Sequence, residues 1–178
     1  MTNSSALWTN FKTAFCRALD ETGRPELLRM WQAVQEKTYF YEWSLMPAVK
    51  RHLGYDLHVE RLRCDYTFLD PNQVPLIAVE AENAHQTAAH EMHCLCSLAA
   101  PLKILLLSCD WQASEKAKYL PEWREIIRAH HAVVSVNCHY GIIVGEWDEP
   151  DDALLKFSFT LLDTDGAILE DEIRSVAE

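Results

Sequence analysis

Three acidic residues stand on two neighbouring predicted strands, at a spacing that suits a divalent cation. Glu80 and Glu82 are two residues apart in the extended segment 75–82, so their side chains share one face, roughly 6.5–7 Å apart. Asp65 lies in the preceding extended segment, 57–69. Crowded carboxylates repel one another, and a proton, an arginine or a divalent cation relieves the repulsion. The pattern therefore predicts a site for Mg²⁺ or Mn²⁺, held by carboxylates, water and the phosphate oxygens of a substrate.

The register of the two strands decides whether Asp65 joins the glutamates. A tight turn between the strands favours pairs whose residue numbers sum to about 145, which places Asp65 opposite Glu80 and Arg63 opposite Glu82. We therefore expect three carboxylates and an arginine in one patch. The same residues could instead form an arginine–glutamate ladder on a solvent-facing strand. The apolar run 76–79 favours a site, because it carries the carboxylates out of a buried strand.

Hydrophobic periodicity predicts the elements that position this patch. Apolar residues at helical spacing predict four helical regions, at 4–20, 25–53 (kinked near Pro47), 83–100 and 114–131. Alternating or continuous apolar runs predict six strands, at 57–69, 75–82, 103–109, 133–139, 141–147 and 154–163. A helix between the second and third strands calls for a crossover, so the expected fold class is α/β with a mixed sheet.

Residues 36–110 resemble the PD-(D/E)xK, or restriction endonuclease-like, superfamily. The resemblance rests on a helix with Glu42, a strand with Asp65, a turn, the strand Ile77-Ala-Val-Glu-Ala-Glu, a helix and the strand Lys103-Ile-Leu-Leu-Leu. It implies a single domain over 1–178, with a restriction endonuclease-like mixed β-sheet flanked by helices, a core at about 36–147 and an N-terminal helical extension.

The resemblance also implies roles for individual residues. Asp65 and Glu80 would bind Mg²⁺, with Glu42 as a further metal ligand. Glu82 stands where the family usually has lysine, and some restriction enzymes of this fold cleave with Glu-x-Glu. Lys103 could supply the missing cation from the next strand. The accessory residues expected beside the patch are Arg63, Gln86 and His90.

The implied function is a divalent-metal-dependent nuclease that hydrolyses phosphodiester bonds of DNA, with Asp65, Glu80 and Glu82 as catalytic residues. The alternative is a catalytically inactive protein of the same fold that acts as an interaction or regulatory module. A third interpretation, a small acidic α/β binding protein unrelated to nucleases, predicts that Asp65 and Glu80 do not converge.

The charge is unevenly distributed along the chain. The formal net charge is −11, and residues 146–178 carry 11 acidic and 2 basic residues, so residues 1–145 sum to −2. This balance argues against a protein that coats nucleic acid by phosphate neutralisation alone, and it permits a nuclease. The acidic C-terminal segment is either a solvated face or a surface for a protein partner or a second copy of the chain.

Several other classes of site are disfavoured. The 5 glycines are scattered, so the chain has no Rossmann fingerprint or P-loop, and we expect no organic cofactor. No GxSxG motif is present. The His and Cys residues of 85–96 lack a second ligand pair for structural zinc. Without an export signal or a long apolar run, and with 6 cysteines in no disulfide-rich pattern, we expect a cytoplasmic protein with reduced thiols and no membrane contact.

Overall fold

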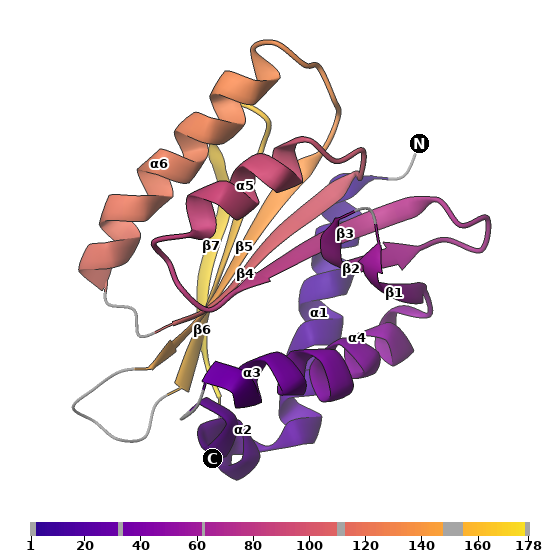
Figure 1. Ribbon diagram of the computed structural model, residues 1–178, viewed down its shortest axis with the longest axis vertical. Coiled ribbons are helices and arrows are strands. Elements are labelled where there is room, and N and C mark those ends of the chain that lie inside the picture. Colours follow the sequence, from indigo (N-terminus) through magenta and orange to yellow (C-terminus); the bar gives the residue numbers. More distant parts are fainter. Residues whose placement is uncertain (1–2, 32–33, 62, 110–112, 148–154, 177–178) are drawn as a thin grey trace.

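A mixed seven-stranded sheet runs through the centre of the protein in this computed structural model, with helices on both faces (Figure 1). The structure describes residues 3–31, 34–61, 63–109, 113–147 and 155–176. The strands follow one another across the sheet in chain order, from β1 at one edge to β7 at the other. Pairs β3–β4 and β4–β5 are parallel and the other pairs are antiparallel. The strands are β1 (Asp56–Arg61), β2 (Cys64–Leu69), β3 (Pro75–Glu82), β4 (Leu102–Cys109), β5 (His139–Trp147), β6 (Leu155–Leu162) and β7 (Ile168–Ser175).

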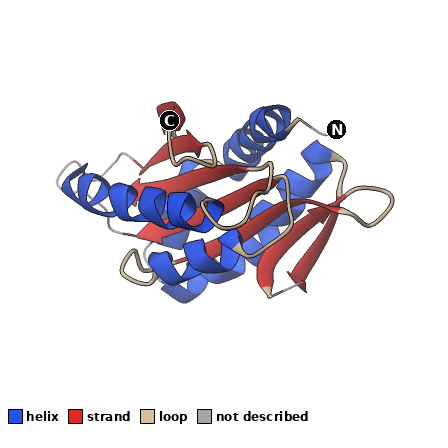
Figure 2. Cartoon of the chain, turned by 90° about the horizontal axis from the view of Figure 1, so that it is seen from above, coloured by secondary structure: helices blue, strands red, loops and turns tan. Residues whose placement is uncertain are grey.

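Two hydrophobic cores fill the spaces between the sheet and its helices. One core packs the N-terminal helices against one face, and the other packs α5 and α6 against the opposite face. The view from above shows helices on both sides of the sheet (Figure 2). The mixed α/β class predicted from the sequence is therefore confirmed. The helices are α1 (Ser4–Thr22), α2 (Arg24–Trp31), α3 (Val34–Phe40), the π-helical segment η1 (Tyr41–Leu45), α4 (Met46–Leu53), α5 (Ala88–Cys96) and α6 (Ala113–His131).

One close contact fixes α1 on the sheet. A Cβ atom added to Gly141 in β5 would lie 2.4 Å from Cζ3 of Trp8, whose ring is 1 % exposed. The missing side chain at Gly141 therefore makes room for the Trp8 indole, which also packs edge-on against Phe159 of β6.

The single strand predicted at 57–69 is wrong. The chain reverses within it and forms an antiparallel hairpin of β1 and β2, with Arg61 paired to Cys64. Arg63 at the turn has a φ of 61°, and Glu60 has a φ of 52°. Both values lie in the left-handed region, where glycine, asparagine and aspartate are the usual occupants. Because the turn contains none of the usual turn residues, the alternating pattern ran through it unbroken.

The C-terminal half differs from the prediction in three places. The strand expected at 133–139 is absent as far as Cys138, and β5 instead runs continuously from His139. The helix expected from residue 83 begins only at Ala88, after a turn. Strand β7 was not predicted, because its sequence Ile-Leu-Glu-Asp-Glu-Ile-Arg-Ser is mostly exposed and lacks a buried apolar face.

The region predicted as one helix at 25–53 is helical over its described residues, as α2, α3, the π-helical η1 and α4. Pro47 lies in the first turn of α4. The wider π-helical turn comes directly before it. Within the described residues, no helix is long and apolar enough to span a bilayer.

Candidate functional site

The registers of three strands place Glu60, Asp65 and Glu80 in one row across the sheet. The pairs Val59–Tyr66 and Arg61–Cys64 bracket Glu60 opposite Asp65. The β2–β3 pairs from Tyr66–Val79 to Phe68–Ile77 sum to 145, as predicted, and the register shifts at the next pair, Leu69–Pro75. Asp65 and Glu80 continue the first register beyond Tyr66 and Val79. Backbone geometry therefore brings three carboxylates to neighbouring strands at the same level.

Asp65 and Glu80 are linked by hydrogen bonds across β2 and β3. The backbone N–H of Asp65 donates to Oε2 of Glu80 at 3.3 Å, and the N–H of Ala81 donates to Oδ2 of Asp65 at 2.8 Å. Glu80 is only 3 % exposed, and its second oxygen, Oε1, is buried with no hydrogen-bond partner in the part of the chain that the structure describes. An unpartnered buried carboxylate oxygen is costly, so this atom requires either a proton or a ligand.

The electrostatics of the site disfavour a second negative charge. Burial, together with the neighbouring charge of Asp65, raises the pKa of Glu80 to about 8. Burial also raises the pKa of Asp65, and the charges of Glu60 and Glu82 add to the effect. Glu91 of α5 shows the same upward shift in pKa, caused by burial and then by the charges of Glu82 and Asp65. Near neutral pH, the Glu80 carboxyl therefore tends to hold a proton that a cation could replace.

A small pocket opens beside Asp65 on the side of α3 and η1. Its volume is about 130 Å³, and Glu42, Glu60 and Asp65 supply carboxylates to its lining. Glu42 comes from η1, and π-helical turns occur frequently at functional sites because they displace a side chain from regular helical spacing. Tyr41 and Tyr66 supply aromatic walls, so the pocket combines negative charge with flat apolar surface.

Glu82 has a different role in the observed geometry. Its Oε1 accepts hydrogen bonds from the backbone N–H groups of Asn83 at 2.6 Å and Ala84 at 3.0 Å. The side chain thus closes the turn between β3 and α5. The negative charge of Glu82 still affects the site, because it helps to raise the pKa values of both Asp65 and Glu91.

The structure does not bring Lys103 to the carboxylates. Its side chain is fully buried, and Nζ donates to the carbonyl oxygen of Cys96 and to the hydroxyl of Tyr140, each at 3.2 Å. The parallel register pairs Lys103 with Ala78, two residues before Glu80. The hypothesis that Lys103 replaces the family lysine is therefore not supported by its position.

The remaining predicted accessory residues lie around the site rather than in it. Arg63 is exposed at the β1–β2 turn. Its positive charge partly opposes the rise that burial causes in the pKa of Cys94 in α5. Gln86 and His90 are also exposed. His90 Nε2 lies 3.8 Å from the sulfur of Cys94, the one pairing found within this His and Cys group among the described contacts.

Three charged residues near the site were missed at the sequence level. Glu60 was missed because its place opposite Asp65 depends on the unrecognised hairpin, and Glu91 because it joins through the packing of α5. Lys37 of α3 is 5 % exposed, and its Nζ donates to the carbonyl oxygen of Ser108 at 3.0 Å. Ser108 follows Leu107, the β4 partner of Glu82. Lys37 was missed because the sequence shows it only as one lysine within a predicted helix.

The carboxylates of the site suit a divalent cation that keeps several water ligands. Among the described residues, no three His, Cys, Asp or Glu side chains are already arranged as a metal shell. Mg²⁺ usually takes only one or two protein carboxylates and fills its other positions with water and substrate oxygens. Asp65 and the unpartnered oxygen of Glu80 meet that requirement, so the residues fit such a cation.

The acidic C-terminal segment is engaged within the molecule where the structure describes it. Lys12 of α1 forms ion pairs with Glu170 and Glu172 of β7. On the other side of the strand, Lys116 of α6 pairs with Asp171 at 2.8 Å. These contacts hold the edge strand between α1 and α6 and use three of its carboxylates.

Comparison with known proteins gives this chain no family by similarity: no family model matches it, and no curated protein matches it.

Proposed function

We propose that the protein is a restriction endonuclease-like, divalent-metal-dependent nuclease whose metal site is built on Asp65 and Glu80. The observation that carries the proposal is the buried Oε1 of Glu80, which has no hydrogen-bond partner among the described residues, on a side chain whose Oε2 accepts a hydrogen bond from the Asp65 N–H. Mg²⁺ or Mn²⁺ is the proposed cofactor, and DNA is the proposed substrate. Glu42, which lines the same pocket as Asp65, is the proposed third ligand.

The order of elements supports this fold assignment. From α3 to β4, the chain forms a helical region, three antiparallel strands, the crossover helix α5 and a parallel strand. The sequence resemblance rests on the same order for the helix with Glu42, strands β2 and β3, helix α5 and strand β4, and β1 adds one strand before them. Helices α1 and α2 form the N-terminal extension, and β6 and β7 extend the sheet on the other side.

The chemistry of the proposed reaction follows from charge. A divalent cation would stabilise the negative charge that develops on the phosphate and would activate a water molecule. Asp65 is oriented for this role by the N–H of Ala81, and Glu80 by the N–H of Asp65. The Glu80 carboxyl must lose its proton before it can bind a cation, so cation binding strengthens as the pH rises toward 8.

Exposed aromatic side chains adjacent in sequence to two residues that line the pocket suit an unpaired base. Trp43 is 70 % exposed and follows Glu42 directly in η1, and Tyr39 is 62 % exposed one turn earlier. Aromatic faces that bases can stack on are typical of proteins that bind single-stranded nucleic acid. We therefore propose that the substrate strand is unpaired where it meets this surface.

A catalytically inactive interaction or regulatory module is the second candidate, and one observation favours it. The lining of the pocket beside Asp65 includes no lysine or arginine among the described residues, and Lys103 points to Cys96 and Tyr140. Without a cation from the protein, water orientation and charge neutralisation would depend on the metal alone. Such a protein would bind metal without cleaving DNA.

Calorimetric titration with Mn²⁺ and a cleavage assay separate the candidates. The nuclease proposal predicts saturable Mn²⁺ binding at pH 8, and cleavage of single-stranded DNA that is lost in Asp65→Asn and in Glu80→Gln. Glu122→Gln, on the exposed face of α6, is the matched control and retains both activities. Binding without cleavage supports the inactive module. No binding at millimolar Mn²⁺ overturns the metal site.

A further inference from the structure

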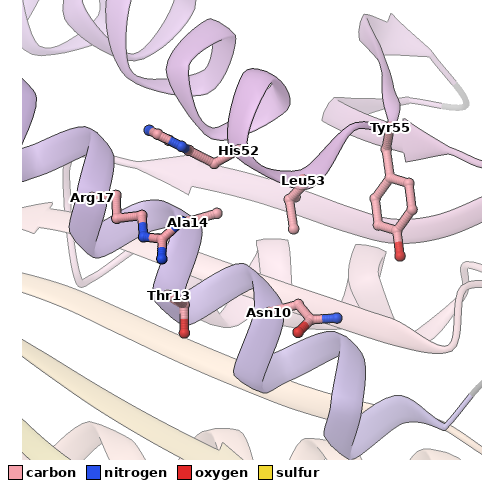
Figure 3. Close-up of a pocket in the computed structure, with 7 residues that line it drawn as sticks. All are labelled: Asn10, Thr13, Ala14, Arg17, His52, Leu53 and Tyr55. Carbon is pink, nitrogen blue, oxygen red and sulfur yellow. The ribbon is translucent and has the colours of Figure 1, made fainter.

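A second pocket lies between α1 and the end of α4, on the N-terminal helical layer. Its volume is about 310 Å³, the lower end of the range for small-molecule sites. Figure 3 shows Asn10 and Arg17 projecting from α1, His52 from α4 and Tyr55 from the segment that follows α4. The nearly buried Ala14 lies between the two α1 residues and leaves the space open.

The lining of this pocket is rich in hydrogen-bond donors. The Arg17 guanidinium, the Asn10 amide and the Tyr55 hydroxyl have no hydrogen-bond or ion-pair partner in the part of the chain that the structure describes. No carboxylate is among the described lining residues, whereas three line the pocket beside Asp65. The chain has a net charge of −11, so a pocket lined by an arginine and a histidine and by no described carboxylate differs from the acidic character of the whole chain.

The charges around the pocket are consistent with an anion. Glu21, a carboxylate partner of the lining, lies 2.8 Å from Nε2 of His52 and 3.0 Å from Arg51. Its negative charge is therefore offset by the Arg51 guanidinium outside the lining. Arg17 remains as a guanidinium that can donate two parallel hydrogen bonds to a phosphoryl or carboxylate group.

We propose that this pocket binds the phosphoryl group of an anionic ligand, with Arg17 as its principal contact and Asn10 and Tyr55 as further donors. The inference does not rest on the proposed nuclease function. The pocket is separate from the acidic one: Tyr55 directly precedes β1 and Glu60 lies near its other end, about 16 Å away at 3.3 Å per residue. The phosphoryl group can belong to a small monophosphate or to a nucleic-acid strand.

Calorimetric titration with inorganic phosphate, in the presence of EDTA and at constant ionic strength, tests the proposal. Wild-type protein and Asp65→Asn are expected to bind phosphate equally, because the two sites are independent. Arg17→Ala is expected to weaken binding about tenfold or more, and Asn10→Ala about threefold, as for charged and neutral hydrogen bonds respectively. Arg17→Lys keeps the charge without the fork and is expected to lie between wild type and Arg17→Ala.

Arg128→Ala on α6 is the matched control, since Arg128 is also an exposed arginine and pairs with Glu125 outside the pocket. It is expected to bind phosphate like the wild type. Unchanged binding by Arg17→Ala, or equal binding of chloride, overturns the proposal. Far-ultraviolet circular dichroism establishes that each variant is folded.

Two further ligands identify the source of the phosphoryl group. A nucleoside monophosphate that binds more tightly than inorganic phosphate, and depends on Arg17, supports a small-molecule site. A short oligonucleotide without terminal phosphates that binds more tightly supports a strand-binding site. If neither ligand competes with inorganic phosphate, the pocket binds an adventitious ion only, and the proposal is overturned.

Discussion

Asp65 and Glu80 orient each other across two strands: Glu80 accepts a hydrogen bond from the backbone of Asp65, and Asp65 accepts one from the residue after Glu80. The two carboxyl groups are thus held by the backbone rather than by flexible neighbours. Burial of the Glu80 carboxyl, together with the neighbouring charge of Asp65, raises the pKa of Glu80 to about 8.

The stability of the protein should fall as the pH rises from about 4.5 to about 8. The pKa of Glu80 is about 8 in the folded state against 4.5 ordinarily, so between these values the folded state holds a proton that the unfolded state has released. The unfolding free energy then decreases as the pH rises, by at most about 1.4 kcal/mol for each pH unit. Urea unfolding of wild type and Glu80→Gln at several pH values measures this slope. Glu80→Gln should have the shallower slope, and equal slopes would contradict the assignment.

Mn²⁺ should raise the melting temperature of the wild type at pH 8. A cation on Asp65 and Glu80 binds the folded state only, so it stabilises in proportion to its occupancy. Glu42→Gln should reduce the shift in part, because Glu42 lines the same pocket as Asp65, and Asp65→Asn should remove it. Differential scanning fluorimetry with and without EDTA makes the comparison. If Mn²⁺ raised the melting temperature of Asp65→Asn as much as that of the wild type, the proposed metal site would be wrong.

Lys103 should prove structural rather than catalytic. Burial lowers its pKa from 10.5, so in the alkaline range the unfolded state holds the extra proton and the unfolding free energy rises with pH. Lys103→Met keeps the buried stem and should lose this rise, whereas Lys103→Ala should also lose packing, at a cost of about 2–4 kcal/mol. Both variants should bind Mn²⁺ like the wild type at temperatures where they are folded. Weaker Mn²⁺ binding by folded Lys103→Met would show that Lys103 contributes to the metal site.

Gly141→Ala should destabilise the protein by about 1–3 kcal/mol, since the added methyl group would overlap the Trp8 ring. The double variant Trp8→Phe/Gly141→Ala should lose less than the sum of the single changes, because the smaller ring relieves the overlap. Chemical denaturation of the four proteins gives the coupling energy. Additive losses would mean that α1 can shift to accommodate the methyl group.

Trp43→Ala should leave stability within about 0.5 kcal/mol of the wild type, because Trp43 is an exposed side chain. It should nevertheless weaken binding of single-stranded DNA, measured by fluorescence anisotropy in the presence of Ca²⁺, by the loss of one base stack. Val133→Ala provides a matched change at an exposed apolar residue outside the site. Equal DNA affinity of Trp43→Ala and wild type would exclude the stacking surface.

Much of the site could be predicted because local rules determine it. The run 75–82 forms β3 as predicted, and its alternation alone places Glu80 and Glu82 on one face. The Asp70 side chain caps the following turn through the N–H groups of Asn72 and Val74. The pair next to the turn is Leu69–Pro75, and a register shift between Phe68 and Leu69 leads to the register of the Phe68–Ile77 pair, which, continued along the strands, brings Asp65 opposite Glu80.

What the sequence by itself determined is the α/β class, the β2–β3 register and the pairing of Asp65 with Glu80, because each depends on neighbours along the chain. The tertiary structure decided the rest. Glu60 joined the site through a hairpin whose turn residues adopt left-handed backbone angles without glycine. Lys103 turned toward Tyr140 because the packing of α5 and β5 offered it partners. Helices α1 and α4 pack together around the pocket that Arg17 lines. The two segments are too far apart in the chain for any local sequence pattern to predict this contact.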